Sequence, residues 1–551
     1  MWTSTLELSI KRILPTKILG LGWRGAYFSS LAPLQVSNLP RQPLTGGNGN
    51  WVRVHNRLAG ICGSDLHLVF ADGDLRIAPA ALPAHSLSYP GHEVVGEVIE
   101  IGDLVQGLHV GDRVALQSGP NCLSADGNPP CHACATGNYN LCENGNLPGP
   151  TQIGGGWSEE MLIHEQQLFR VPATMNDEQA VLLEPTAVAV HAVLRRAPQA
   201  GEKVLIVGAG TIGLLTLQVV RALAPQAEIS VLARHDFQVE QATRMGATHI
   251  LYGRDSYESI EKTTGAHLYT GMLGNKMLLG GYDVIYDTVG TRSTVHDSLR
   301  WARARGTVVL VGLSLHQLTL DLSPIWHQEV NLIGSMSHGS EFWPLGTAQQ
   351  RSTFAIASDL ITNGLIHPEK LITHRFALSS YREALTTATN KKASRSIKVI
   401  FDAALLPASA VPNAYPHASV PLRRPLFKTR DFSNERAEAE ITPHSAPLPP
   451  SAAQNAPVTG PSHFTMSQSE DFTADFALSP GEDESTDFDS TQFISPKARR
   501  PPTPLQFRRT TGDILETPPI GPTGVTNVPS STLEHIEEPR GGSISAPHNE
   551  A

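Results

Sequence analysis

The chain has 551 residues, with 42 Lys and Arg against 52 Asp and Glu and a formal net charge of −10. Beyond residue 402 there are 11 basic and 18 acidic residues, a net of −7, so the first 402 residues carry only about −3. This balance argues against nucleic acid as a partner of the folded part. No run of eighteen apolar residues occurs, so no transmembrane helix or membrane partner is expected.

The first 48 residues hold the single acid Glu7 and five basic side chains, namely Lys11, Arg12, Lys17, Arg24 and Arg41. This bias is typical of a mitochondrial transit peptide. We expect instead an ordinary basic first strand followed by a linker, in a cytoplasmic protein, and keep the mitochondrial transit peptide as the alternative. The five cysteines indicate a reducing compartment, because a C-x2-C pair in a long chain without a secretory signal suggests metal binding more than disulfides.

The region up to about residue 185 reads as a compact β domain. Residues 51–54 alternate like a half-buried strand, 94–102 form a second strand, and a turn and strand follow at 111–114. Glycine and proline interrupt this region, and long helical periods are missing.

From residue 199 the pattern changes to alternating strands and helices. An apolar strand at 203–207 is followed by a helical pattern over 213–223 and a strand at 229–232. Mostly apolar strands separated by helices are typical of a parallel sheet covered on both faces. Further strands of this kind are expected at 282–287, 306–312 and 330–334. A helix over 354–362 and a final strand at 397–401 are expected to return the chain to the first domain.

After residue 403 proline, serine, threonine and acidic residues dominate, and the segment 470–489 contains several acids but no Lys or Arg. Such a sequence buries too little apolar surface to offset the entropy cost of ordering, so this tail is expected to be disordered. The motifs at 495–496 and 499–504 suggest a proline-directed phosphorylation site or a polyproline ligand, which would make a tail-binding protein a candidate partner. The alternative is a solvated tail without a specific partner.

Cys62 and His92 stand in two separate turns, and Glu93 follows the histidine directly. Thiolate, imidazole and carboxylate are zinc ligands, and a catalytic zinc site leaves one position open. Taken alone, the pair is weak evidence, because a small buried thiol and a satisfied histidine explain it better. The remaining cysteines are clustered within 21 residues, with two of them three apart, and this spacing favours a structural zinc site; they are Cys122, Cys131, Cys134 and Cys142.

A glycine-rich turn follows the apolar strand and opens the helix, and its expected cofactor-binding residues are Gly208, Gly210, Thr211, Ile212 and Gly213. In this context the motif predicts that a dinucleotide pyrophosphate lies at the helix N-terminus.

The residues after the next strand bear on which nicotinamide cofactor is bound. Twenty residues beyond the last glycine, where NAD enzymes place an acid, stand Ala233 and then Arg234. An arginine there can pair with a 2′-phosphate, so NADP(H) is expected over NAD(H). A shift in register by three would instead put Asp236 on the ribose and favour NAD.

In this order the motifs resemble the zinc-dependent medium-chain alcohol, polyol and threonine dehydrogenases over roughly residues 30–402. The resemblance implies an α/β fold in which a GroES-like catalytic domain encloses an inserted Rossmann domain. The expected segments are 13–187 and 335–402 for the catalytic domain, 188–334 for the Rossmann domain and 403–551 for the disordered tail.

The resemblance also implies roles for individual residues. Cys62 and His92 match catalytic zinc ligands, Glu93 matches a carboxylate that binds or approaches the metal, and Glu184 matches the remaining protein ligand of the polyol and threonine branch. Ser64 and His67 match the proton relay, and Asp65 matches a carboxylate behind the ligands. Glu184 as a helix N-terminal charge and His67 as an exposed loop residue remain the alternatives.

The cysteine cluster departs from the family spacing. Cys122 lies nine residues before Cys131, and Asn128 occupies the position expected for the first cysteine. Either the loop 123–130 bulges and Cys122 still binds, or the site has only three thiolates. We expect the bulge, because eight residues can span the few ångströms required.

These features predict a zinc-dependent oxidoreductase with one catalytic and one structural Zn²⁺ that transfers hydride between an alcohol and NADP(H). The resemblance implies a homodimer or homotetramer. The rival hypothesis is a non-catalytic NADP(H)-binding interaction protein with a regulatory tail, and a zinc-free quinone reductase is disfavoured by the ligand set. Substrate specificity is expected from the segments 70–89, 155–157 and 335–342.

Overall fold

The computed structural model describes residues 1–405, apart from 45–48, 84–86, 126, 146–151 and 254–255. Disorder was predicted from residue 403, but residues 403–405 form a short 3₁₀ helix. The rest of the predicted tail, with its motifs, lies outside the described residues. Among the described helices, none combines the length and the hydropathy needed to cross a bilayer.

The expected β domain is a seven-stranded sheet with the order β19-β20-β3-β5-β6-β8, in which β7 also pairs with β3. Its strands are β3 (Trp51–Gly60), β5 (Val94–Ile101), β6 (Arg113–Leu116), β7 (Glu160–His164), β8 (Leu168–Arg170), β19 (Ile372–Phe376) and β20 (Lys398–Asp402). The long strand β3 is buried over most of its length and pairs with both β5 and β7. The strand predicted at residues 51–54 is therefore present, but all four residues are buried, so the expected half-buried alternation is wrong.

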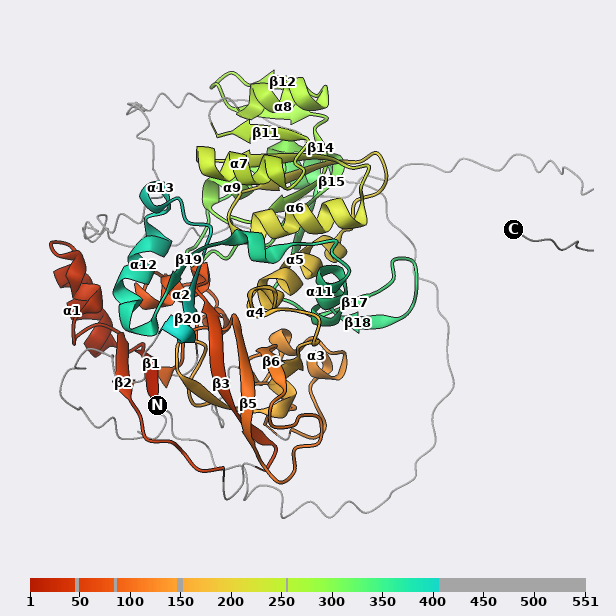
Figure 1. Ribbon diagram of the computed structural model, residues 1–551. Coiled ribbons are helices and arrows are strands. Elements are labelled where there is room, and N and C mark those ends of the chain that lie inside the picture. The colour runs from red at the N-terminus through yellow and green to blue at the C-terminus, as the bar shows by residue number, and fades with distance from the viewer. Residues whose placement is uncertain (45–48, 84–86, 126, 146–151, 254–255, 406–551) are drawn as a thin grey trace, which may run out of the picture. The chain divides into compact units, whose positions relative to one another are not determined.

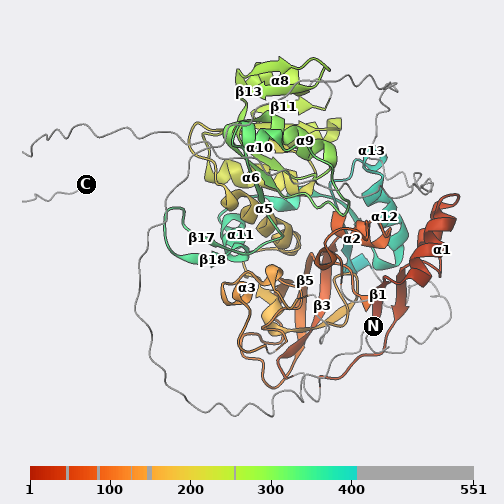
Figure 2. The ribbon, with the colours of Figure 1, turned by 180° about the vertical axis from the view of Figure 1, so that it is seen from behind.

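The strand and helix alternation from residue 203 forms a six-stranded parallel sheet with the order β11-β10-β9-β14-β15-β16. Its strands are β9 (Lys203–Val207), β10 (Glu228–Ala233), β11 (His249–Tyr252), β14 (Tyr282–Asp287), β15 (Ala302–Leu310) and β16 (Asn331–Gly334). Its helices are α6 (Thr211–Leu223), α7 (Asp236–Arg244), α8 (Ser256–Thr264), α9 (Arg292–Trp301) and α10 (Ser323–His327), and Figures 1 and 2 show them on both faces. This is the predicted doubly wound sheet. The hairpin β12 (His267–Thr270) and β13 (Lys276–Leu279) was not predicted.

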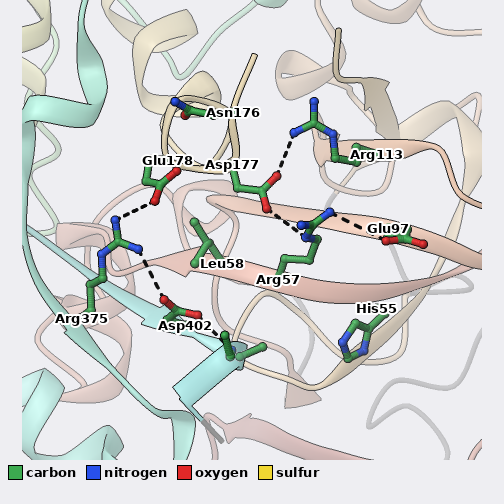
Figure 3. A pocket seen from close by; sticks show the side chains of 12 residues that line it. His55, Arg57, Leu58, Glu97, Arg113, Asn176, Asp177, Glu178, Arg375 and Asp402 are labelled. Atoms are coloured by element: carbon green, nitrogen blue, oxygen red, sulfur yellow. Dashed lines mark hydrogen bonds and ion pairs between the residues drawn. The ribbon is translucent and has the colours of Figure 1, made fainter. Parts of the chain in front are cut away.

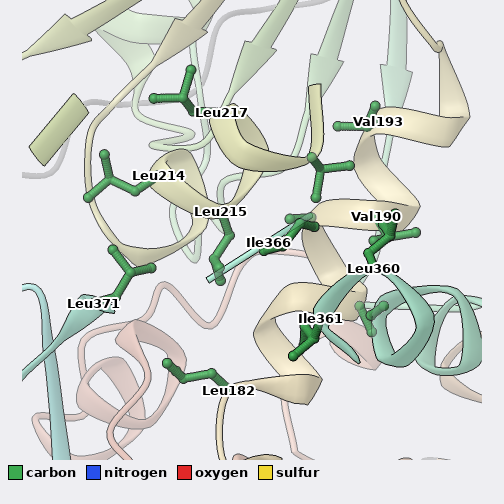
Figure 4. Packing of buried hydrophobic residues seen from close by; sticks show 14 of the residues in the cluster. Leu182, Val190, Val193, Leu214, Leu215, Leu217, Leu360, Ile361, Ile366 and Leu371 are labelled. Carbon is green, nitrogen blue, oxygen red and sulfur yellow. The ribbon is translucent and has the colours of Figure 1, made fainter. Parts of the chain in front are cut away.

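Among the described residues, one of three buried hydrophobic clusters spans both sheets. Helix α5 (Leu183–Arg195) is buried over most of its length, and it packs against α6 and against α11 (Thr353–Thr362), as Figure 4 shows. The same cluster includes Leu58 and Val95 of the β domain and Val204 and Ile206 of the parallel sheet. The short helix α4 (Asp177–Ala180) and the hairpin β17 (Ser340–Phe342) and β18 (Gln350–Ser352) flank this region. The core fixes how the zinc-site loops lie against the cofactor-binding half.

The chain returns to its first sheet after the parallel sheet, as expected. Strand β20 pairs antiparallel with β3, with Ile400 opposite Gly60, and β19 adds the edge beyond it. Helices α12 (Tyr381–Thr389) and α13 (Lys391–Ser394) connect the two strands. The return places the last strand directly beside the residues that precede Cys62.

The amino-terminal region is folded. Strand β1 (Trp2–Glu7) pairs with β2 (Leu34–Asn38) and β4 (Leu87–Ser88), so the expected first strand is present. The linker expected after it is instead a connection that contains helix α1 (Ile10–Gly20). Beyond α1, this connection packs against the β domain, where the ring centroids of Tyr27 and Phe70 are 5.2 Å apart. Residues before position 13 therefore belong to the folded part.

Candidate active site

The two turns that carry Cys62 and His92 meet because their strands pair. Strand β3 ends at Gly60 and β5 begins at Val94, and Ala59 lies opposite Val94 in the antiparallel register. Cys62 then precedes helix α2 (Gly63–Val69), while His92 stands just before β5. Ligand atoms of Cys62, His92 and Glu93 all lie within 4.8 Å of one another. Zinc bonds of about 2.0–2.3 Å allow one ion to reach all three after small side-chain movements.

The buried carboxylate of Asp65 ties the two turns together. One oxygen accepts from the Cys62 backbone N–H at 3.1 Å, and the other accepts from the Gly91 N–H at 3.2 Å and lies 3.4 Å from His92 Nδ1. Burial alone would raise the pKa of Asp65, but His92 and the two N–H donors lower it overall. Burial likewise opposes protonation of His92, yet Asp65 raises its pKa. Asp65 thus orients the imidazole from behind, as the resemblance implied.

Glu93 is held by a lysine that the sequence analysis did not single out. Lys398 Nζ lies 2.7 and 2.6 Å from the two carboxylate oxygens, and it also donates to the Ile61 carbonyl at 3.2 Å. Both side chains are almost fully buried, with 2% and 1% of their surface exposed. The sequence signal was one lysine inside the otherwise apolar strand 397–401, but its partner is 305 residues away along the chain.

Glu184 lies in the first turn of α5 and is buried. Burial raises the pKa of its carboxyl to about 7, with Glu93 adding repulsion and His92 and Lys398 acting in the opposite direction. Among the described residues, Glu184 is not part of the set whose ligand atoms lie within 4.8 Å. The charges of His92, Glu93 and Lys398 nevertheless act on its carboxyl group. Glu184 lacks the direct ion pair that Glu93 makes with Lys398.

The two residues matched to the proton relay lie three positions apart on α2. Ser64 and His67 are both half-buried. His67 Nδ1 lies 3.1 Å from Asp72 Oδ2, so the histidine is part of a hydrogen-bonded group and is not a bare loop residue. Asp72, which belongs to the predicted specificity segment 70–89, therefore contacts a predicted site residue.

The four clustered cysteines come together, including Cys122. Their sulfur atoms all lie within 4.8 Å of one another, with Cys142 Sγ 3.7 Å from Cys122 Sγ and 4.0 Å from Cys131 Sγ. Sulfur atoms on a tetrahedral zinc with bonds of about 2.3 Å are about 3.8 Å apart, so the group fits a four-thiolate site. Cys131 N–H and the Asn144 amide donate to Cys122 Sγ and lower its pKa to about 7, which favours the thiolate. Asn128 is exposed, and Cys122 lies with the other three thiols, as the first alternative expected.

Replacing Cys122 with serine is expected to reduce bound zinc from two ions per chain to one and to lower the melting temperature. The physical reason is that removing a thiolate opens a site whose closed coordination stabilises a polar loop. Metal analysis of the purified full-length variant checks the prediction. Asn128→Ala is the control and should keep both ions; loss of zinc in that variant instead would contradict the assignment of Cys122.

The glycine turn lies between β9 and α6, at the point where the order of the parallel strands reverses. Dinucleotides bind at such switch points. A Cβ at Gly213 would stand 2.0 Å from the Gly208 carbonyl oxygen, so glycine there lets the helix pack on the strand. A Cβ at Gly210 would meet no atom within 4 Å, which leaves open space beside the start of α6. This geometry fits a pyrophosphate at the helix N-terminus.

The end of β10 bears on the cofactor type. Strand β10 ends at Ala233, Arg234 follows it as an exposed residue, and Asp236 is the first residue of α7. Arg234 N–H and His235 N–H both donate to Gln238 Oε1, which fixes the turn. The acid thus stands on the helix, and the arginine stands at the strand end.

A cavity of 630 Å³ lies away from these side chains, and Figure 3 shows its lining. Its charged groups pair with one another. Asp177 lies 2.9 Å from both Arg57 and Arg113, and Arg375 lies 2.9 Å from Glu178 and 3.4 Å from Asp402. These ion pairs join α4 to the β domain. The cavity holds none of the predicted site residues.

Trp157, expected in a specificity segment, has another position. It is 1% exposed, its indole N–H donates to the Gly60 carbonyl at 2.9 Å, and its ring would clash with a Cβ at Gly91. Trp157 therefore packs against both turns that carry Cys62 and His92. Because it is buried, it has no surface that a substrate could contact.

Comparison with known proteins gives matches in the same order as the two sheets. Residues 48–173 match the family described as "Alcohol dehydrogenase GroES-like domain", and residues 211–349 match "Zinc-binding dehydrogenase". The chain is 29% identical to L-idonate 5-dehydrogenase of Vitis vinifera over 64% of this chain and 87% of that protein. It is 28% identical to sorbitol dehydrogenase of Arabidopsis thaliana over 64% of this chain and 88% of that protein.

Solved structures agree with this assignment. A zinc-binding dehydrogenase from Sinorhizobium meliloti 1021 bound to NADP superimposes with a TM-score of 0.54 at 25% identity, covering 73% of this chain and 99% of the other. The GroES-like sheet, the six-stranded parallel sheet, the four-cysteine cluster and the Cys/His/Glu site occur together. The chain belongs to the zinc-containing medium-chain alcohol and polyol dehydrogenases, enzymes that act on a CH–OH group with a nicotinamide cofactor.

Proposed function

We propose that this protein oxidises a polyol or related alcohol with NADP⁺ and catalyses the reverse reduction with NADPH. The observation that carries the proposal is the approach of Cys62, His92 and Glu93 to within 4.8 Å in a chain that also has the glycine turn. The relatives named for idonate and sorbitol support a polyol substrate. An amino alcohol remains within the same chemical class.

A catalytic zinc would be held by Cys62, His92 and a carboxylate. Such an ion supplies Lewis-acid polarisation of the alcohol or carbonyl oxygen. Glu184 is the better third ligand on charge grounds, because Lys398 already neutralises Glu93, whereas a zinc ion would compensate the buried carboxylate of Glu184. The four clustered cysteines would hold the structural zinc.

The chain's own residues would position the reactants and move the proton. Ser64 would accept a hydrogen bond from the alcohol and pass its proton to His67, which releases it to water. The glycine turn and the N-terminus of α6 would hold the pyrophosphate, and the core around α5 would keep the two halves aligned so that the carbinol carbon faces the nicotinamide. Hydride then passes directly between them.

A substrate panel tests the proposal. Purified full-length protein, loaded with zinc, is offered sorbitol, xylitol, D-arabinitol, L-idonate, threonine and simple alcohols with either NADP⁺ or NAD⁺, and NADPH or NADH formation is followed. We expect turnover of at least one polyol, with NADP⁺ preferred. Zinc-loaded protein that binds NADPH but turns over no alcohol or carbonyl would favour the non-catalytic interaction protein.

Replacing Arg234 with alanine is expected to reduce the kcat/KM for NADP⁺ relative to NAD⁺ by about 10- to 100-fold. A charge-assisted hydrogen bond contributes about 1.5–3 kcal/mol, and that interaction would be lost only for the cofactor with a 2′-phosphate. Arg244→Ala, at the other end of α7, is the control and should leave the ratio unchanged. A wild-type preference for NAD⁺ that Arg234→Ala does not alter would instead support a ribose contact from Asp236.

We further propose that the catalytic domain comprises the expected residues 13–187 and 335–402, extended at its start by strand β1 (Trp2–Glu7), around a Rossmann domain at 188–334. We also propose that the protein is a cytoplasmic homodimer or homotetramer. The family resemblance supports the domain bounds and the assembly. The metal-binding thiols of the cysteine cluster support a reducing compartment. Light scattering of the full-length protein tests the assembly, and a monomer would contradict it.

A further inference from the structure

Asp72 lies between two imidazoles at the edge of the candidate active site. Its Oδ2 atom is 3.1 Å from His67 Nδ1, and its Oδ1 atom is 3.2 Å from His316 Nε2. His67 belongs to the catalytic helix α2, whereas His316 follows strand β15 of the parallel sheet. One carboxylate therefore contacts a predicted proton-relay residue and the cofactor-binding half at the same time.

The backbone turns sharply to bring Asp72 to this place. Helix α2 ends at Val69, and Ala71 adopts a left-handed conformation with φ of +50°. This lets the Asp72 N–H donate to the His67 carbonyl at 2.7 Å. A non-glycine residue with positive φ stores conformational energy that the surrounding structure must offset. Here the turn brings the carboxylate of Asp72 back to the ring of His67. Phe70, between them in the chain, packs against the ring of Tyr27 in an edge-to-face contact.

Contacts from the other half hold the same loop. Asp74 N–H donates to the Leu315 carbonyl at 2.8 Å, and the Gln317 amide donates to the Arg76 carbonyl at 3.1 Å. These bonds flank the His316 contact with Asp72 on both sides. The loop that supports His67 is thus positioned jointly by the catalytic helix and by the cofactor-binding half.

Electrostatics keep Asp72 charged. The hydrogen bond from His67 is the largest influence on its pKa and lowers it, partial burial opposes this, and the charges of His67, His316 and Lys17 lower it further. Lys17 belongs to the amino-terminal helix α1. An ionised carboxylate accepts but cannot donate, so the Nδ1 atom of His67 carries hydrogen toward Asp72. The other ring nitrogen, Nε2, is then the one able to accept a proton.

We propose that Asp72 is a positioning residue of the proton relay: it holds His67 with Nδ1–H toward its carboxylate, which makes Nε2 the ring nitrogen that accepts the proton, while His316 secures Asp72. This inference rests on the proposed dehydrogenase function. In alcohol oxidation, the proton of the hydroxyl group reaches Nε2 through Ser64 and is released to water. The hydride leaves the carbon that bears this hydroxyl group and passes to NADP⁺. Both hydrogens and the electron pair are accounted for.

Asp72→Asn tests the proposal, because the side chain keeps its size and loses its charge. We expect kcat for alcohol oxidation at pH 7 to fall by about 10- to 100-fold, the scale found when a partner that orients a functional histidine is removed. The KM for the alcohol and the affinity for NADPH should change by less than about twofold, since general-base catalysis acts on kcat. The deficit should shrink as pH rises, because hydroxide then takes the proton. A full-activity variant with an unchanged pH profile would overturn the inference.

A double-mutant cycle separates positioning from a general effect on the fold. In a His67→Gln background, Asp72→Asn should cause no further loss, because its action passes through the histidine. Losses that multiply would overturn the inference. His316→Ala, at a side chain 54% exposed, should produce a smaller loss with the same pH trend and guards against misfolding of the first variant. An unchanged rate and pH profile in His316→Ala would overturn the role of His316.

The matched control is a second histidine and aspartate pair. His296 Nδ1 and Asp297 Oδ1 on α9 are 3.2 Å apart, with side chains 27% and 31% exposed, against 25% and 31% for His67 and Asp72. Asp297→Asn should leave the pH profile unchanged, and a shift equal to that of Asp72→Asn would contradict the proposal. Inactive wild-type protein would instead defeat the proposed function, whereas active wild type with a normal Asp72→Asn variant would defeat the Asp72 inference alone.

Discussion

Replacing Cys62 with serine is expected to lower kcat by at least about 10³-fold while NADPH binding persists. Lewis-acid stabilisation by a catalytic metal contributes several kcal/mol, and each 1.36 kcal/mol corresponds to a tenfold change in rate. The cofactor site is built from β9, α6 and the turn between them, none of which includes Cys62. Catalysis and cofactor binding should therefore separate in this variant.

The measurement combines steady-state kinetics with NADPH fluorescence titration and zinc analysis. Zinc should fall from two ions per chain to one, because the four-cysteine cluster is built from a different loop. Wild-type protein, assayed beside the variant, provides the reference for all three quantities. Turnover that survives the loss of Cys62 would mean that the thiolate has no part in the chemistry.

Replacing Lys398 with methionine is expected to lower the free energy of unfolding by about 3–5 kcal/mol. The substitution leaves the carboxylate of Glu93 buried without its cation, and breaking a buried ion pair by removing one partner has about this cost. The pair is nearly solvent-free, with 2% and 1% exposed surface, so screening by water does not reduce the effect. Urea unfolding of the zinc-loaded protein measures it.

Two further variants make this prediction specific. Lys398→Met combined with Glu93→Gln should recover much of the lost stability, because the uncompensated charge is then gone. Arg244→Met removes the exposed pair with Glu240, whose side chains are 64% and 47% exposed, and should change stability little. Equal losses for the buried and the exposed pair would contradict the buried-charge explanation.

Local patterns predicted most of the sheet strands well because their burial follows from sequence periodicity. Strands β9 and β14 begin and end where the apolar runs indicated. Strand β3 is present where predicted, but residues 51–54 are buried on both faces because β5 and β7 both pair with it. The same logic brought Cys62 and His92 together, since both ligands flank strands that pair. The resemblance then supplied roles that spacing alone left open.

What the sequence analysis missed depends on contacts between distant segments. Helix α1 was not expected, because Pro15 lies inside it and a proline normally interrupts a helix. In the structure its apolar residues Ile10, Leu14 and Ile18 are exposed. Lys398 stood out only as a charge in an apolar strand, and nothing local connects it with Glu93. The bulged loop at Cys122 was expected from its length, but its closure required the three-dimensional arrangement of all four thiols.

The central claim is that a zinc ion lies at Cys62 and His92, separate from the four-cysteine cluster. Anomalous diffraction at the zinc absorption edge, from crystals of the full-length protein grown with NADP⁺, locates the metal directly. We expect two peaks per chain. One should lie among Cys62, His92 and the carboxylate of Glu184 or Glu93, and the other among the four cysteines. A single peak, at the four cysteines alone, would contradict it.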